Sequence, residues 1–69
     1  MFGTLIYYDK DGTVSVMHFN ETSDEEIVDY IQRNNVKSDE IKVLEIEEGK
    51  NRRVYILQRD FDKFIRDNS

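Results

Sequence analysis

The sequence predicts an α+β fold with the element order ββαββα, in which a four-stranded antiparallel sheet has both helices packed on one face. Two pairs of β-rich segments are each joined by a short turn that contains a glycine, Gly12 in the first and Gly49 in the second. A helix-start signal, Ser23 followed three residues later by Glu26, separates the two pairs. The last segment carries a helical stripe made of Phe61, Phe64 and Ile65.

The first two strands are expected to form a hairpin. Thr4 to Tyr8 is rich in β-branched and aromatic residues, and Thr13 to Phe19 alternates along its length. The turn between them ends at Gly12, where a positive φ is wanted. Both faces of the second strand carry apolar residues, and we expect Val14 and Val16 to be the pair that points into the core.

The first helix is predicted to begin at Ser23, through a capping box. The Ser23 hydroxyl can accept from the amide of Glu26 while the Glu26 carboxylate returns to the Ser23 amide. The helix should end at Asn34-Asn35, because asparagine tolerates the left-handed conformation that follows many helices. At 100° per residue the side chains that face the core are Ile27, Val28, Tyr30 and Ile31.

The second hairpin is less regular. In Ile41 to Glu47 the apolar residues change phase, which predicts either a β-bulge or burial of both faces. Arg53 to Gln58 is apolar on both faces, so Val54 to Leu57 is the candidate for a central strand. Asp60 is expected to cap the final helix. Tyrosines are expected on the open face of the sheet, which would then be partly apolar: Tyr7, Tyr8 and Tyr55.

Length and composition indicate one small domain over residues 1–69. The sequence has no cysteine, so no disulfide or thiolate site is expected. No run approaches the roughly 20 apolar residues of a membrane span. The first eight residues lack the basic start and cleavage site of a secretory signal. We therefore expect a cytoplasmic protein that does not bind membranes.

The charge is distributed unevenly. Residues 1–48 carry twelve acidic and four basic side chains, a formal charge of −8, whereas residues 49–69 carry six basic and three acidic, a charge of +3. The total of −5 hides this polarity. Because a negative protein repels nucleic acid and anionic membrane, the charge favours a basic protein as the partner.

No arrangement of residues predicts catalysis, a metal site or a cofactor. His18 is the only histidine, and a general base needs an oriented partner. Asp9-x-Asp11-Gly12 has the spacing of a calcium loop only in part, since Tyr7 and His18 fall where acidic ligands belong. Glu45 and Glu47 share a strand face, but no apolar pocket is predicted to separate their pKa values. A non-enzymatic protein is expected.

The acidic residues supply the preferred functional hypothesis. Glu25 and Asp29 are one helical turn apart, about 6 Å, and Glu45 and Glu47 are about 6.6 Å apart along a strand. With Glu26, such rows of anions are comparable to phosphates along a nucleic-acid strand. In composition the chain resembles the small acidic phage proteins that act as DNA mimics or inhibitors of host proteins. The resemblance implies a phage or bacterial protein whose acidic surface engages a basic partner, such as a DNA-binding protein.

Three other interpretations compete with this one. The acids can be an ordinary solvated helix face together with helix-capping charge. The basic second hairpin can bind nucleic acid, with basic groups on phosphates and an aromatic ring stacked on a base. Its candidate residues are Arg52, Arg53, Tyr55 and Arg59. The third interpretation is a structural or accessory protein that forms a homodimer through its exposed sheet face.

Overall fold

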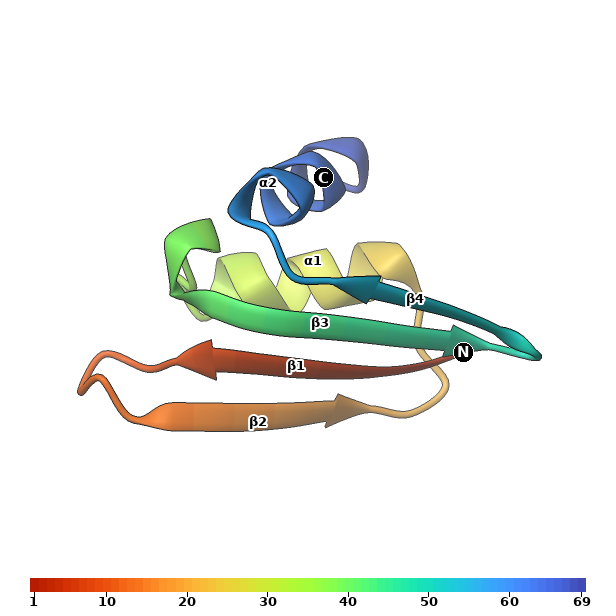
Figure 1. Ribbon diagram of the computed structural model, residues 1–69, viewed down its shortest axis with the longest axis horizontal. Helices are drawn as coiled ribbons and strands as arrows, with labels where there is room; N and C mark the ends of the chain where they lie inside the picture. The colour runs from red at the N-terminus through yellow and green to blue at the C-terminus, as the bar shows by residue number, and fades with distance from the viewer.

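A computed structural model describes residues 1–69 as a single sheet covered by two helices (Figure 1). The elements in order are β1 (Phe2–Tyr8), β2 (Val14–Phe19), α1 (Asp24–Arg33), a short 3-10 helix η1 (Ser38–Glu40), β3 (Ile41–Glu48), β4 (Asn51–Tyr55) and α2 (Gln58–Asp67). The strands are all antiparallel and lie in the order β2-β1-β3-β4. The predicted α+β fold with the order ββαββα is confirmed.

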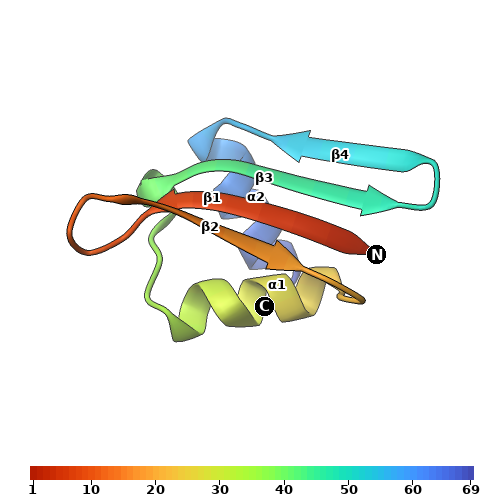
Figure 2. The same ribbon diagram turned by 90° about the horizontal axis from the view of Figure 1, so that it is seen from below.

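The sheet has a covered face and an open face. Both helices lie on the same side of the strands, as the two perpendicular views show (Figures 1 and 2). The core between helices and sheet consists of Leu5, Phe19, Ile27, Val28, Ile31, Val36, Ile41, Leu44, Ile46, Phe61 and Phe64. No helix packs on the other side, which we call the open face.

The expectation that Val54 to Leu57 forms a central strand is wrong. The central strands are β1 and β3, and β4 lies at an edge. It ends at Tyr55, and α2 already begins at Gln58, two residues before the expected cap at Asp60. Ile56 and Leu57 form the link between strand and helix, where they are 63% and 49% exposed. Their apolar character is therefore not explained by burial on both faces of a strand.

The ends of α1 follow the sequence closely. The Ser23 hydroxyl accepts from the Glu26 amide at 3.2 Å, as predicted. The other half of the capping box differs, because the Glu26 carboxylate accepts from the Thr22 hydroxyl at 3.5 Å and not from the Ser23 amide. The helix ends at Arg33, Asn34 caps it, and Asn35 has a φ of +53°.

The orientation predicted for β2 is wrong, since Val14 and Val16 lie on the open face and are 48% and 54% exposed. The register explains why. Leu5 in β1 is fully buried under the helices and pairs with Met17 in β2. Because paired residues point to the same face, Met17 turns inward and its neighbours turn outward.

The change of phase in β3 is a β-bulge. Ile6 of β1 pairs with Val43, but the next residue, Tyr7, pairs with Ile41. Lys42 is thus the extra residue of the bulge. The bulge lets Ile41 share the covered face with Leu44 and Ile46, and all three are buried.

Of the three tyrosines expected on the open face, only Tyr8 lies there. The Tyr7 hydroxyl is 2.9 Å from that of Tyr30 in α1, so Tyr7 faces the helices. The ring of Tyr55 also faces them and lies 5.2 Å, centroid to centroid, from Phe64 of α2. The open face is apolar mainly because of its aliphatic residues.

Candidate functional site

Three carboxylates form an exposed acidic ridge along the outer side of α1. We call Glu25, Glu26 and Asp29 the acidic ridge; each is exposed. The helix places them there because its buried side is taken by Ile27, Val28 and Ile31. Asp29 forms an ion pair with Arg33, one turn further along the helix. Glu25 and Glu26 pair with no basic side chain.

A shallow hollow borders the ridge on each side. The hollow toward the end of β2 is lined by Phe19, Thr22, Glu26, Asp29, Tyr30, Arg33 and Asn34. The hollow toward the end of α2 is lined by Glu25, Val28, Asp29, Gln32, Asp67, Asn68 and Ser69. Asp29 therefore lies between two depressions, each with a further ridge carboxylate. A lysine or arginine side chain that entered either hollow would meet at least two carboxylates.

The second hollow holds a third acid, Asp67, at the end of α2. Its carboxylate is 2.6 Å from the Lys63 ammonium. This ion pair lowers the pKa of Asp67 below its usual value. Asp67 is therefore ionised at neutral pH, but Lys63 balances its charge, so it adds a carboxylate and little net charge to the α2 side of the ridge.

Glu45 and Glu47 do not join the acidic ridge, because they lie on the opposite side of the sheet. Leu44 and Ile46 occupy the covered face of β3, so the residues between and after them point to the open face. Glu45 binds Arg52 of β4 at 2.8 Å, and this bond holds the pKa of the Glu45 carboxyl below its usual value. Glu47 forms no ion pair. The five candidate acids thus make two separate surfaces.

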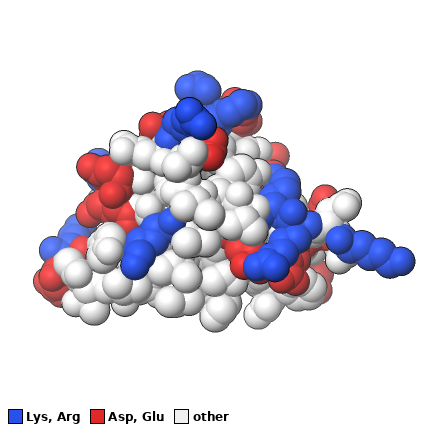
Figure 3. All heavy atoms as spheres, viewed as in Figure 1, with Lys and Arg blue, Asp and Glu red and all other residues white.

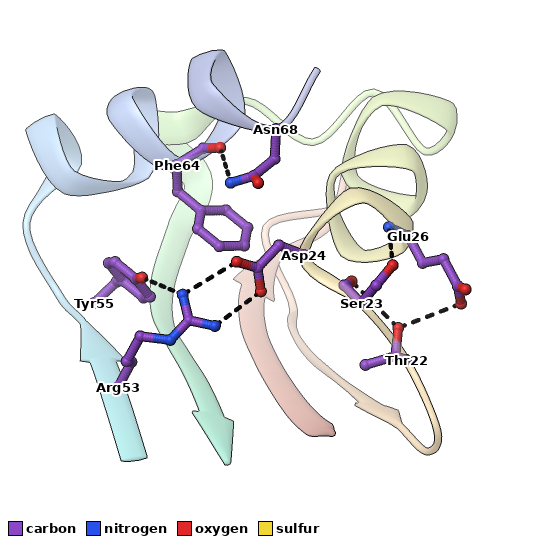
Figure 4. Close-up of polar contacts among 8 residues, drawn as sticks. All are labelled: Thr22, Ser23, Asp24, Glu26, Arg53, Tyr55, Phe64 and Asn68. Carbon is purple, nitrogen blue, oxygen red and sulfur yellow. Dashed lines mark hydrogen bonds and ion pairs between the residues drawn. The ribbon is translucent and has the colours of Figure 1, made fainter. Parts of the chain in front are cut away.

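The four residues of the basic alternative are also separated. Arg52 and Arg53 are consecutive in β4, so the first points to the open face and the second to the helices. Arg53 donates to Asp24 at 2.9 and 3.2 Å and to the Tyr55 hydroxyl at 2.9 Å (Figure 4). Binding to Asp24 raises the pKa of Arg53 further above its already high value. Arg59, in the first turn of α2, is exposed and forms no ion pair.

No local pattern predicts the link between Arg53 and Asp24, which lie 29 residues apart. Asp24 is explained on its own by the preference for acids in the first turn of a helix. Arg53 is explained by its place in the basic run that begins at Lys50 in the turn and continues into β4. Only the packing of β4 beside the start of α1 and under α2 brings the two together with Tyr55 and Phe64 (Figure 4).

His18 lies on the open face in β2, where its Nδ1 is 3.2 Å from the Thr4 hydroxyl oxygen. A shallow hollow there is lined by Phe2, Gly3, Thr4, His18, Phe19, Asn20, Glu45 and Glu47. Both His18 and Glu47 are exposed to solvent. No three histidine or carboxylate side chains anywhere in the chain are grouped to hold a metal ion.

The fold defines a small α+β protein with one open sheet face and two acidic areas. Comparison with protein-family models, curated proteins and solved structures finds no match. None of the helices has the length and apolar character needed to cross a membrane.

Proposed function

We propose that the protein is a non-enzymatic interaction module that binds a basic protein, such as a DNA-binding protein, through the acidic ridge, as a DNA mimic or inhibitor. The supporting observation is a difference in pairing. Five of the ten basic side chains are within ion-pair distance of a carboxylate of the same chain: Arg33, Arg52, Arg53, Lys63 and Arg66. Glu25 and Glu26 have no such counter-ion, so their charge is available to another molecule.

The spacing of the ridge suits a partner that binds phosphates. Glu25 and Asp29 are separated by one helical turn, about 6 Å along the axis. Both stand on a helix whose inner side is packed in the core. Binding should therefore cost little conformational freedom beyond that of the two acidic side chains. Exposed charges of this kind act mainly on association rate and specificity, and salt screens them. The complex should therefore weaken steeply as ionic strength rises.

Charge reversal tests the proposal. The double variant Glu25→Lys with Asp29→Lys reverses the ridge charge from −3 to +1 and spares Glu26, which interacts with Thr22 at the start of the helix. Asp39→Lys with Glu48→Lys is the matched control, because both residues are exposed and the net charge changes equally. A basic partner captured from a bacterial lysate is purified, and its affinity for each variant is measured by calorimetry at several salt concentrations.

We expect the ridge variant to bind at least about tenfold more weakly, and the control to change affinity by less than about threefold. The proposal fails if no basic protein is captured, or if the two variants lose affinity equally. An equal loss would mean that only net charge matters.

The nucleic-acid alternative requires the basic hairpin to release its present partners. Arg53 would have to leave Asp24, and the Tyr55 ring would have to leave Phe64 before it could stack on a base. We expect no mobility shift with short single- or double-stranded oligonucleotides at low salt. A shift that Arg52→Glu abolishes would replace the acidic-ridge proposal with this alternative.

A further inference from the structure

The centre of the open face is an apolar patch that no part of the chain covers. We define the open-face patch as Ile6, Tyr8, Val14, Val16 and Val43. The register places Val16, Ile6 and Val43 in one row across β2, β1 and β3, with Val14 and Tyr8 as the adjacent pair. Val14, Val16 and Tyr8 are 48%, 54% and 40% exposed. Uncharged atoms predominate over the strands when this side is viewed obliquely, with charged groups around them (Figure 3).

The patch has opposite charges at its two ends. At the end near the turn between β1 and β2, the Lys42 ammonium lies 5.4 Å from the centre of the Tyr8 ring. At the other end are Glu45 and Glu47, of which only Glu45 is paired, with Arg52. One end therefore carries a positive charge and the other a net negative charge. The row through Ile6 lies between these two charged ends. Along β1, Tyr8 is two residues away from Ile6 in one direction, and Thr4, which pairs with Glu45, is two residues away in the other.

We propose that a second copy of this chain covers the open-face patch, related by a two-fold axis that runs across the strands along the row of Ile6. Such a rotation turns the faces toward each other and reverses the strand direction. Each strand then lies over its own copy, with Val16 near Val16 of the other protomer. Lys42 of each protomer approaches Glu45 of the other, so both ends of the interface gain an attractive pair.

Charge selects this axis over the other face-to-face arrangement. A two-fold axis parallel to the strands would leave the strand direction unchanged. It would bring Lys42 close to its own copy and place Glu45 and Glu47 near theirs. Like charges placed so close together disfavour an interface. Of these two axes, the one across the strands joins the apolar centres and opposite charges at once.

The size of the face sets the strength expected of the dimer. A face four strands wide, at about 4.8 Å per strand, and about seven residues long, at about 3.3 Å per residue, has an area of roughly 440 Å². Stable interfaces bury about 800 Å² on each partner. We therefore expect reversible association with a dissociation constant in the micromolar to millimolar range.

The first experiment measures self-association by sedimentation equilibrium up to about 1 mM chain. Val16→Glu places two carboxylates together at the axis, and we expect it to weaken the dimer at least tenfold. Asp62→Lys, in the exposed face of α2, is a control with a charged substitution away from the patch. Circular dichroism establishes that each variant is folded. A wild-type chain that stays monomeric at about 1 mM overturns the proposal, as does unchanged association of a folded Val16→Glu variant.

The second experiment tests the axis by exchanging charges. Lys42→Glu alone puts acids opposite each other, and Glu45→Lys alone puts bases opposite each other, so each should weaken the dimer roughly threefold to thirtyfold. The double variant restores opposite charges and should recover most of the association. If the singles weaken the dimer and the double does not recover it, the proposed axis is wrong. Loss of self-association would leave the acidic-ridge proposal intact, because that ridge lies on the other side of the sheet.

Discussion

Arg53 on the edge strand β4 binds the carboxylate of Asp24, the first residue of α1, with both terminal guanidinium nitrogens, at 2.9 and 3.2 Å. The contact joins the last strand of the sheet to the start of the first helix. It is the only ion pair that connects a strand to a helix. The Arg53 and Asp24 side chains are 39% and 22% exposed, so solvent screens the pair only in part.

The first prediction concerns the coupling between these two residues. A double-mutant cycle with Asp24→Asn and Arg53→Met should give a coupling free energy of about 1 kcal/mol, measured by urea unfolding. Breaking a fully buried pair would cost several times more. Arg52→Met paired with Asp24→Asn is the control and should show no coupling, because Arg52 points to the other face. A coupling near zero for Arg53 would mean that the contact adds nothing to stability.

The second prediction concerns the close approach of β1 to α1 at Gly3. A Cβ atom added there would lie 3.1 Å from Cδ1 of Ile27 and 3.5 Å from the Phe19 ring. Ile27 is fully buried, so a shift of its side chain would disturb its neighbours in the core. Gly3→Ala should therefore destabilise the fold by about 1 to 3 kcal/mol, as overpacking does.

The rescue of that variant is the sharper test. Ile27→Val removes Cδ1 and on its own should cost about 0.5 to 1.5 kcal/mol. In the Gly3→Ala background, unfolding by heat or urea should show that Ile27→Val costs less stability than it does alone, or that it increases stability. Ile6→Val, on the open face, is the matched control and should give no rescue. Additive effects at Gly3 and Ile27 would contradict the proposed clash.

The third prediction concerns stability at high pH. The hydrogen bond between the Tyr7 and Tyr30 hydroxyls, together with partial burial, raises the pKa of Tyr30 from 10 to about 12. The folded state thus holds the Tyr30 proton more tightly than the unfolded state. The contribution of Tyr30 to the free energy of unfolding is complete below about pH 10 and is lost as the pH rises toward about 12. Unfolding free energies measured across this range should fall, and the fall should be smaller in Tyr30→Phe than in a Tyr8→Phe control.

The sequence predicts most of the fold because local signals suffice for most elements. Gly12 has the expected positive φ, the turn at Gly49 is present, and α1 begins and ends where Ser23 and Asn34 indicate. The orientation of β2 could not be obtained in this way, because apolar residues occupy both of its faces. It depends on the pairing of Met17 with the buried Leu5, which is a contact between strands.

The candidate site shows the same limit. The exposed positions of Glu25, Glu26 and Asp29 follow from helical periodicity alone. The side to which Glu45 and Glu47 point depends on the bulge at Lys42, which the sequence indicated only as one of two alternatives. The separation of the helix acids from the strand acids therefore required the three-dimensional arrangement.

The last prediction joins the two proposed surfaces. Each acidic ridge lies on the helix side of its own sheet, so pairing of the open faces would leave two ridges on opposite outer sides of the dimer. One compact partner could not reach both ridges, and each ridge should bind its own partner without avidity. Per-chain affinity should then be the same for the wild type and for Val16→Glu.

Calorimetry and light scattering together test this expectation. At concentrations above the dissociation constant of the dimer, wild-type chains should form complexes of two chains with two partners. The Val16→Glu variant should form complexes of one chain with one partner. A loss of affinity in a folded Val16→Glu variant would show that partner binding uses the open face or requires the dimer. Because the ridge and the patch are separated by the full thickness of the sheet and α1, such a loss could not be a direct effect on Glu25 or Asp29.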